Sequence, residues 1–175
     1  MQYFVIDPTC YGELGEGTIF ETKNGSREVA QLDMMLKHTP KDDIMSVGGE
    51  RVISEKLAIK LAKTQLNGYE LDDVHVYKSE QFDWGDRPLP EFKWLKVVGV
   101  GLKDDFGIHK RRFVVSEPAL EFLKGFSIGQ CEIVRSEEFP FDMSWEEEKK
   151  RFFARDRQEL KALGLENKRG TDFLK

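Results

Sequence analysis

The chain follows one scheme of hydrophobic and polar positions twice. Residues 51–55 read Arg-Val-Ile-Ser-Glu, and about sixty residues later 112–117 read Arg-Phe-Val-Val-Ser-Glu. β-branched runs suit a pleated, partly buried strand, and a serine hydroxyl accepts a free backbone N–H where a helix begins. The glutamate that follows places negative charge at the positive end of the helix dipole. Each copy therefore predicts a strand followed by a capped helix, with a buried face at helical spacing: Leu57, Leu61 and Ala62 in one, Ala119, Leu120 and Leu123 in the other.

A second strand-like segment ending in Ser-Glu follows each helix, at 74–80 and at 132–137. The two predicted strand–helix–strand units thus span about 51–82 and 112–139. If the two strands of a unit run parallel in one sheet, the crossover is expected to be right-handed. The distance from Ser54 to Ser79 is five residues longer than that from Ser116 to Ser136. Duplication and coincidence both stay open at this point.

Shorter patterns predict the rest of the body. Strand-like runs stand at 3–6, 18–22, 44–47 and 94–100, and residues 27–37 fit either a helix or a strand. Asn24-Gly25 and Gly48-Gly49 are strong turn signals. Residues 11–17 and 103–107 are rich in Gly, Asp and Glu and predict a loop and a turn. The glycines at 12, 15 and 17 fit neither a P-loop nor a dinucleotide fingerprint.

The chain changes character near Pro140. Ser144 and Glu147 fit a capping box, and the predicted helix runs to about Leu163, where Gly164 suits its C-terminal end. Its apolar stripe is thin, which favours packing along one edge or forming an oligomer. We therefore predict one α+β domain: a core at 1–143 with a mixed sheet and two related units, and an amphipathic helix with a loose tail at 144–175.

Composition narrows the function. The 175 residues are 39% hydrophobic and 34% charged, with a formal charge of −5. Nucleic-acid binding needs a concentrated basic face, and the one basic run, 109–112, borders the second copy. Neither a signal peptide nor a membrane-spanning segment is indicated, so we expect a cytoplasmic protein that binds neither nucleic acid nor membrane. Cys10 and Cys131 lack disulfide or zinc spacing, and each is expected to be buried or inert.

Signatures of a reaction centre are missing. The three histidines at 38, 75 and 109 stand apart from metal or triad patterns, and His75 is expected at the solvent face or in a structural hydrogen bond. Adjacent aspartates at 42–43, 72–73 and 104–105 favour turns. We expect no metal and no cofactor. A small hydrolase or transferase whose carboxylates converge only in the fold remains the alternative.

The best candidate for a partner-binding surface is the loop between the two units. Asp83, Trp84, Asp86 and Arg87 stand in a segment with two prolines and a glycine, which predicts an ordered surface loop. Trp and Arg are the residue types that most often dominate binding energy. In the competing interpretation, Trp84 and Trp94 fill the core between the two units.

These motifs together resemble a family of immunity proteins from bacterial polymorphic toxin systems. The residues that carry the resemblance are Met1, Tyr3 and Phe4, then Val52-Ile53-Ser54-Glu55 and Val114-Val115-Ser116-Glu117. The likeness covers most of residues 1–139 and does not extend to the charged tail. It implies a single α+β domain without catalytic residues, which binds and occludes a cognate toxin. The leading hypothesis is therefore a non-enzymatic immunity protein, with the hydrolase and an oligomerising structural protein as alternatives.

Overall fold

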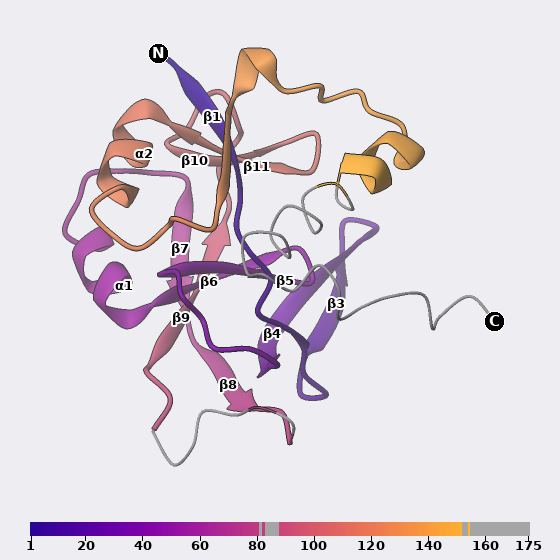
Figure 1. Ribbon diagram of the computed structural model, residues 1–175, viewed down its shortest axis with the longest axis vertical. Helices are drawn as coiled ribbons and strands as arrows, with labels where there is room; N and C mark the ends of the chain where they lie inside the picture. The colour runs from indigo at the N-terminus through magenta and orange to yellow at the C-terminus, as the bar shows by residue number, and fades with distance from the viewer. Residues whose placement is uncertain (81, 83–87, 152–153, 155–175) are drawn as a thin grey trace. The chain divides into compact units, whose positions relative to one another are not determined.

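The computed structural model describes residues 1–80, 82, 88–151 and 154. The chain divides into two compact units, a body at Met1–Phe139 and a C-terminal unit at Pro140–Lys175. Figure 1 follows the chain through both. The strands of the described body are β1 (Tyr3–Asp7), β2 (Gly12–Leu14), β3 (Ile19–Lys23), β4 (Ser26–Leu36), β5 (Ile44–Val47), β6 (Glu50–Ser54), β7 (Tyr69–Asp72), β8 (Val74–Lys78), β9 (Phe92–Val97), β10 (Phe106–His109), β11 (Arg112–Ser116) and β12 (Glu132–Arg135).

Two short helices and a 3-10 turn complete the described body. They are α1 (Glu55–Leu61), α2 (Glu117–Leu123) and η1 (Ser136–Glu138). The strands form three four-stranded sheets: β5-β6-β9-β7, β10-β11-β1-β12, and β2-β4-β3 with β8 added along β4. The first two are antiparallel throughout, whereas β8 runs parallel to β4. The predicted α+β class is confirmed.

Two of the three sheets are built to one plan. In each, a hairpin is followed by a helix, and the next strand returns on the far side of a central strand that is antiparallel to both. The hairpins pair Ile44 with Ile53 and Phe106 with Val115. The returning strands pair Leu71 with Leu95 and Ile133 with Ile6. We define the first copy as residues 43–72 and the second copy as residues 105–134, equivalent at an offset of 62.

The predicted boundary of the first unit was wrong. Its second strand is β7, whereas the segment at 74–78 forms β8 and joins β4 in another sheet. Leu71 follows Ser54 by the same number of residues as Ile133 follows Ser116. The apparent five-residue difference therefore disappears, because the alternating Val-His-Val-Tyr run had been matched to the wrong strand. The two copies share strand order, register and spacing.

Three further predictions are corrected or settled by the backbone. Residues 27–37 are mostly strand β4, and the 11–17 loop contains strand β2. The turn expected at 103–107 overlaps strand β10, so the basic run at 109–112 spans the turn of a hairpin. Lys110 and Arg111 form that turn with φ values of 45° and 66°. Both residues are in the left-handed region, as a tight two-residue hairpin requires.

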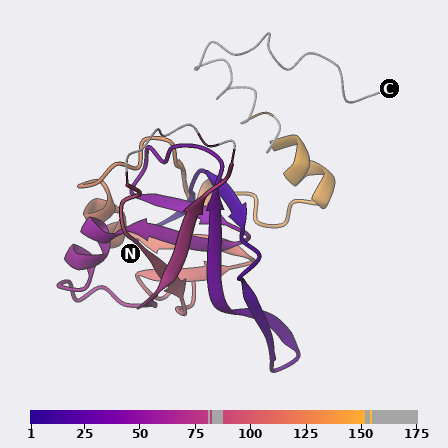
Figure 2. The ribbon, with the colours of Figure 1, turned by 90° about the horizontal axis from the view of Figure 1, so that it is seen from below.

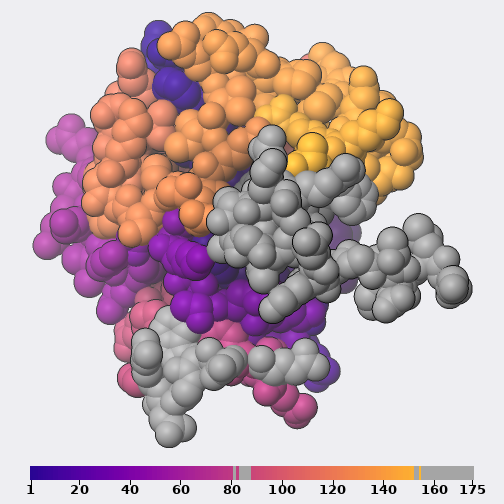
Figure 3. Space-filling view, in the orientation of Figure 1, coloured from indigo at the N-terminus to yellow at the C-terminus, as the bar shows by residue number. Residues whose placement is uncertain are grey.

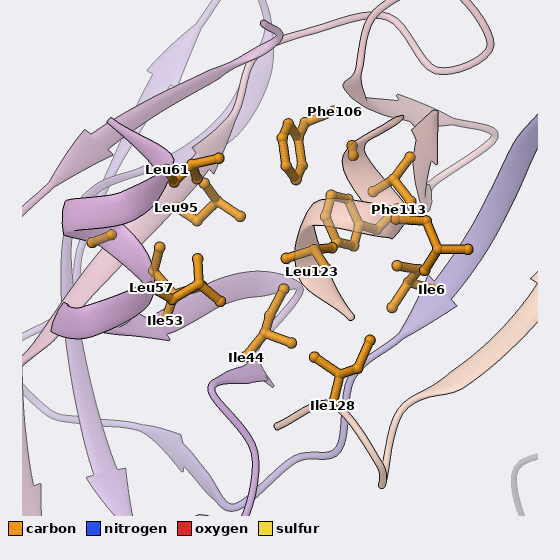
Figure 4. Close-up of a cluster of buried hydrophobic side chains, with 14 residues drawn as sticks. Ile6, Ile44, Ile53, Leu57, Leu61, Leu95, Phe106, Phe113, Leu123 and Ile128 are labelled. Carbon is orange, nitrogen blue, oxygen red and sulfur yellow. The ribbon is translucent and has the colours of Figure 1, made fainter. Parts of the chain in front are cut away.

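The core between the two copies draws equivalent residues from each (Figure 4). Helices α1 and α2 lie on the same side of the body in Figures 1 and 2. Ala62 is exposed, contrary to its predicted place on the buried face of α1. Burying one apolar cluster from both copies makes them a single body. The equivalent buried pairs are Ile44 and Phe106, Ile53 and Val115, Leu57 and Ala119, Ala58 and Leu120, and Leu61 and Leu123.

A second apolar cluster lies on the opposite face of the β5-β6-β9-β7 sheet. Neighbouring residues of β6 point to opposite faces, so Ile53 joins the first cluster and Val52 the second. Trp94 is 2% exposed and belongs to the second cluster, where its indole N–H donates to Glu50 at 3.0 Å. The competing interpretation of Trp94 is therefore partly right: Trp94 is a core residue, but the cluster between the copies does not contain it.

The C-terminal unit begins its helix as the capping box predicts. The Ser144 hydroxyl accepts the Glu147 backbone N–H at 3.4 Å, and the Glu147 carboxylate accepts the Ser144 backbone N–H at 2.8 Å. Hydrogen bonds from Ser144 lower the pKa of Glu147. The helix is described over 145–151 and at 154, so the predicted end at Gly164 lies outside the described residues. Over the described part of the chain, no helix has the length and apolar character needed to cross a membrane.

Candidate functional site

The predicted partner-binding residues Asp83, Trp84, Asp86 and Arg87 lie outside the described residues. The described residues beside them are attached to the body, because Phe82 and Leu89 pack against the second apolar cluster. Pro88–Glu91 have no regular structure and lead into β9, which begins two residues earlier than the sequence indicated. The location of the binding site stays a prediction.

At each helix start the capping serine contacts an aspartate, which is buried in the first copy (Asp43) and half-buried in the second (Asp105). Ser54 is the N-cap of α1: its hydroxyl accepts the Leu57 backbone N–H at 3.4 Å and donates to Asp43 at 2.7 Å. Ser116 caps α2 in the same way, accepting from Ala119 at 3.3 Å and donating to Asp105 at 2.5 Å. The predicted strand–Ser–helix junctions are confirmed.

Each of these carboxylates also holds the loop that follows the other copy's helix. Asp43 accepts the backbone N–H of Ser127, beyond α2, at 2.9 Å. Asp105 accepts the backbone N–H of Asn67, beyond α1, at 3.1 Å. The contacts run in both directions between the copies, although the donors are not at equivalent positions, since Ser127 corresponds to residue 65 at the offset of 62. The carboxylates predicted as turn residues thus join the two copies.

The pKa values of the adjacent carboxylates Asp42 and Asp43 are shifted in opposite directions. Burial acts to raise the pKa of Asp43, but hydrogen bonds from Ser54, Ser127 and Lys56 outweigh it and hold the pKa below its ordinary value. For Asp42, burial raises the pKa, although the Gln130 backbone N–H donates to it at 3.1 Å. Burial acts to raise the pKa of both carboxylates, and their different hydrogen bonds therefore account for the opposite shifts.

Another buried carboxylate, that of Asp33, contacts a histidine. Asp33 is 5% exposed, and its Oδ1 lies 2.5 Å from Nδ1 of His75, while its Oδ2 accepts the Gly17 backbone N–H at 3.0 Å. The His75 ring stacks on Tyr77 with ring centres 5.3 Å apart. His75 is exposed and also makes a structural hydrogen bond, so both parts of its prediction are met. An Asp–His pair can orient an imidazole for proton transfer.

The β3–β4 hairpin projects from the rest of the body (Figure 2). All five residues of β3 are exposed, including Ile19 and Phe20 at 52% and 37%. The Arg27 guanidinium lies over the Phe20 ring at 3.8 Å, which holds the aromatic ring at the surface. Among the residues that the structure describes, β3 pairs with β4 along one edge. Its other edge carries backbone groups that can pair with another chain.

A groove of about 370 Å³ opens beside α1. The outer side of α1 is visible at the left of Figure 3. Helix α1 forms one wall, and the junction of β7 with β8 and strand β9 form the other. The lining residues are Glu55, Ala58, Ile59, Ala62, Leu71, Asp72, Asp73 and Lys93.

The thiols do not form a site together. Cys10 was expected to be buried or inert, and it is not buried: its side chain is exposed, and its Sγ donates to the Gly12 carbonyl. Cys131 is half-buried with its Sγ 3.9 Å from Asp42. Within the described ranges, His, Cys, Asp and Glu side chains do not gather in a group of three that could hold a metal.

Sequence reasoning missed two of these features. The groove depends on small residues at positions 58 and 62, which looked like ordinary helix formers. The Asp–Ser contacts had a visible signal, because an aspartate precedes each capping serine by eleven residues. Comparison with known proteins found no family model, no curated protein and no solved structure that matches the chain.

Proposed function

We propose that this chain is a non-enzymatic binding protein that acts in the cytoplasm as an immunity protein and neutralises a cognate toxin by occluding it. The observation that carries the proposal is the projecting β3–β4 hairpin, whose edge strand exposes Ile19 and Phe20 to solvent. Exposed apolar side chains beside a free strand edge are typical of a protein–protein contact. The strand–Ser-Glu–helix motifs that resemble the immunity family support the same function.

Charge supports the same kind of partner. The formal charge of −5 favours association with a basic protein, because complementary charge accelerates encounter. Toxins that attack nucleic acids are often basic, since they must bind phosphates. In this proposal the residues Asp83, Trp84, Asp86 and Arg87 contact the toxin, next to the anchored positions Phe82 and Leu89.

Substitution of the loop tests this function. Trp84→Ala and Arg87→Ala are expected to weaken binding to the toxin encoded beside this gene by about tenfold or more, with unchanged unfolding. Binding is measured by calorimetry, and protection by growth of cells that express the toxin. Trp145→Ala, a tryptophan of the C-terminal unit that is 68% exposed, is the matched control and should leave both unchanged.

Two outcomes would contradict the proposal. Full protection by both loop variants would remove the loop from the contact. Growth inhibition that the wild-type chain fails to relieve, with no complex formed, would remove the immunity function itself. Unfolding of Trp84→Ala would instead assign Trp84 to the core, and Arg87→Ala would then decide the role of the loop.

One observation favours the second candidate, a small hydrolase or transferase. Asp33 contacts Nδ1 of His75 at 2.5 Å. The His75 side chain, which also carries Nε2, is 71% exposed. Such a pair can act as a general base. The test is an activity screen on ester and phosphoester substrates. Activity that is present in the wild-type chain and lost in His75→Ala would favour the enzyme, whereas equal activity in both would end this alternative.

A further inference from the structure

The groove beside α1 can be compared with the surface of α2 in the same molecule, because α2 is the structural equivalent of α1. Ala58 on α1 and Ala62 at its C-cap correspond to Leu120 on α2 and Lys124 at its C-cap, at the offset of 62. Ala58 is 4% exposed and Leu120 is 3% exposed, so both positions face the body. At both positions the first copy has the shorter side chain, and both alanines line the groove. The groove therefore marks a local difference within a shared plan.

The exposed position between them has changed in the same direction. Ile59 is 51% exposed on α1, whereas its equivalent on α2 is Glu121, which forms an ion pair with Lys124 at 2.6 Å. An exposed isoleucine beside two alanines gives the groove an apolar floor and wall. The second copy has a charged pair at the equivalent place, which is the usual surface of a solvated helix. The first copy has apolar side chains at this place instead.

The rim of the groove is acidic. Three lining residues carry carboxylates, Glu55, Asp72 and Asp73, and one carries an ammonium, Lys93. Lys93 is engaged by Asp73 at 2.7 Å, and Lys96 pairs with Asp72. The lining set alone thus has a formal charge of −2. An apolar surface whose lining carries net negative charge favours a ligand with the complementary pattern.

We propose that this groove binds a basic segment of a partner protein, in which an apolar side chain enters between α1 and β7 and flanking lysines or arginines meet the acidic rim. The volume of about 370 Å³ is at the lower end of the range for ligand sites, which suits one or two apolar side chains. The inference rests on the proposed function only in taking the partner to be a polypeptide. It adds a second contact surface and states the chemistry of the segment that it receives.

Peptide probes of defined pattern test the groove without the toxin. The first probe is a ten-residue peptide that alternates leucine and lysine; the second replaces each lysine with glutamate, and the third replaces each leucine with serine. Amide NMR shifts of the full chain locate the binding site. The leucine–lysine peptide is expected to shift residues of α1, β7 and β9, and each of the other two to bind at least about tenfold more weakly.

Grafting the α2 residue into α1 supplies the decisive variant. Ile59→Glu copies Glu121, and because Ile59 is exposed the fold should survive. It is expected to weaken binding of the leucine–lysine peptide at least about tenfold. The reverse exchange, Glu121→Ile, places the same isoleucine on α2 and should leave the affinity unchanged. Ala62→Lys, also at an exposed position, repeats the test by filling the groove instead of charging it.

The inference is overturned if the shifts lie away from α1, if the glutamate peptide binds as well as the lysine peptide, or if Ile59→Glu and Ala62→Lys both bind as the wild type does. The two proposals fail separately. Toxin neutralisation that persists in Ile59→Glu leaves the function standing and removes the groove. Peptide binding at the groove by a chain that neutralises no toxin leaves the groove standing and removes the immunity function.

Discussion

The first and second copies are alike inside and different outside. Both place a hairpin, a serine-capped helix and a returning strand at the same spacing, and both contribute equivalent residues to one core. Their outer helix faces differ, since Ile59 on α1 stands where Glu121 stands on α2. The buried half of each helix is constrained by close packing, whereas the outer half is free to differ. We therefore look for function where the copies differ.

The contacts that join the copies also differ, and one difference concerns a lysine on α1. The ammonium of Lys56 lies 2.9 Å from the carboxylate of Asp43, whereas the equivalent of Lys56 in the second copy is Pro118. Asp43 thus has a cationic partner on its own helix in addition to Ser54 and Ser127. The side chain of Asp43 is 7% exposed. The first copy should depend more strongly on its aspartate than the second.

Removing each aspartate gives the largest expected effect. Asp43→Ala should lower the free energy of unfolding by about 3 kcal/mol and Asp105→Ala by about 2 kcal/mol, because each removes the acceptor of the capping-serine hydroxyl and of a backbone N–H from the other copy. Urea unfolding followed by circular dichroism measures both. Equal losses would mean that Lys56 adds nothing, and a loss below about 0.5 kcal/mol in either variant would contradict a role in joining the copies.

The capping serines should give a smaller and more equal effect. Ser54→Ala and Ser116→Ala are each expected to cost about 1 kcal/mol, since each removes a helix cap. A double variant that lacks both the serine and the aspartate of one copy should lose less stability than the two single variants together, because the two residues share one hydrogen bond. Strict additivity would show that the Asp–Ser contacts contribute no coupling. Ser79→Ala, outside both copies, is the control.

Lowering the pH should remove the contribution of Asp43 to stability but not that of its neighbour Asp42. The folded-state pKa of Asp43 is lowered, so its contribution is present above the ordinary value of 3.8 and is lost as pH falls through the folded pKa. Asp43→Asn should therefore flatten the acid side of the stability profile. The profile is measured as the free energy of unfolding between about pH 5 and pH 2. A profile as steep as that of the wild type would contradict the shift.

The smallest expected effect is that of Asp42, whose dependence on pH has the opposite sign to that of Asp43. The folded-state pKa of Asp42 is raised, so its contribution is present below 3.8 and is lost as pH rises through the folded pKa. Asp42→Asn keeps an acceptor for the Gln130 N–H and should make the protein slightly more stable at neutral pH. It should also steepen the acid side of the profile. A loss of stability at neutral pH would show that the Asp42 carboxylate is needed in its charged form.

Local signals in the sequence predicted the junctions but not their partners. Ser54 and Ser116 were placed correctly because a cap depends on residues within one helical turn. The same is true of the turns at Asn24-Gly25 and Gly48-Gly49, which have positive φ. The contacts from Asp43 to Ser127 and from Asp105 to Asn67 join residues far apart in the chain. Nothing local specifies them, since they exist only when the two copies pack together.

The wrong predictions have specific causes. The run at 74–78 has a stronger strand pattern than Tyr69–Asp72, so it was taken as the second strand of the first unit. Strand β10 was missed because the two aspartates and Gly107 favour a turn. The groove could not be predicted, because only the comparison of α1 with α2 in space shows that Ala58 and Ala62 leave room. The predicted loop residues at 83–87 stay a prediction.

Hydrogen–deuterium exchange of the chain with and without its toxin tests most directly whether function lies where the copies differ. We expect slower exchange on binding in β3 (Ile19–Lys23), in residues 55–72 of the first copy and in the segment at 82–93, with residues 117–134 of the second copy unchanged. Protection confined to 117–134, with no change in β3 or at 55–93, would contradict this expectation.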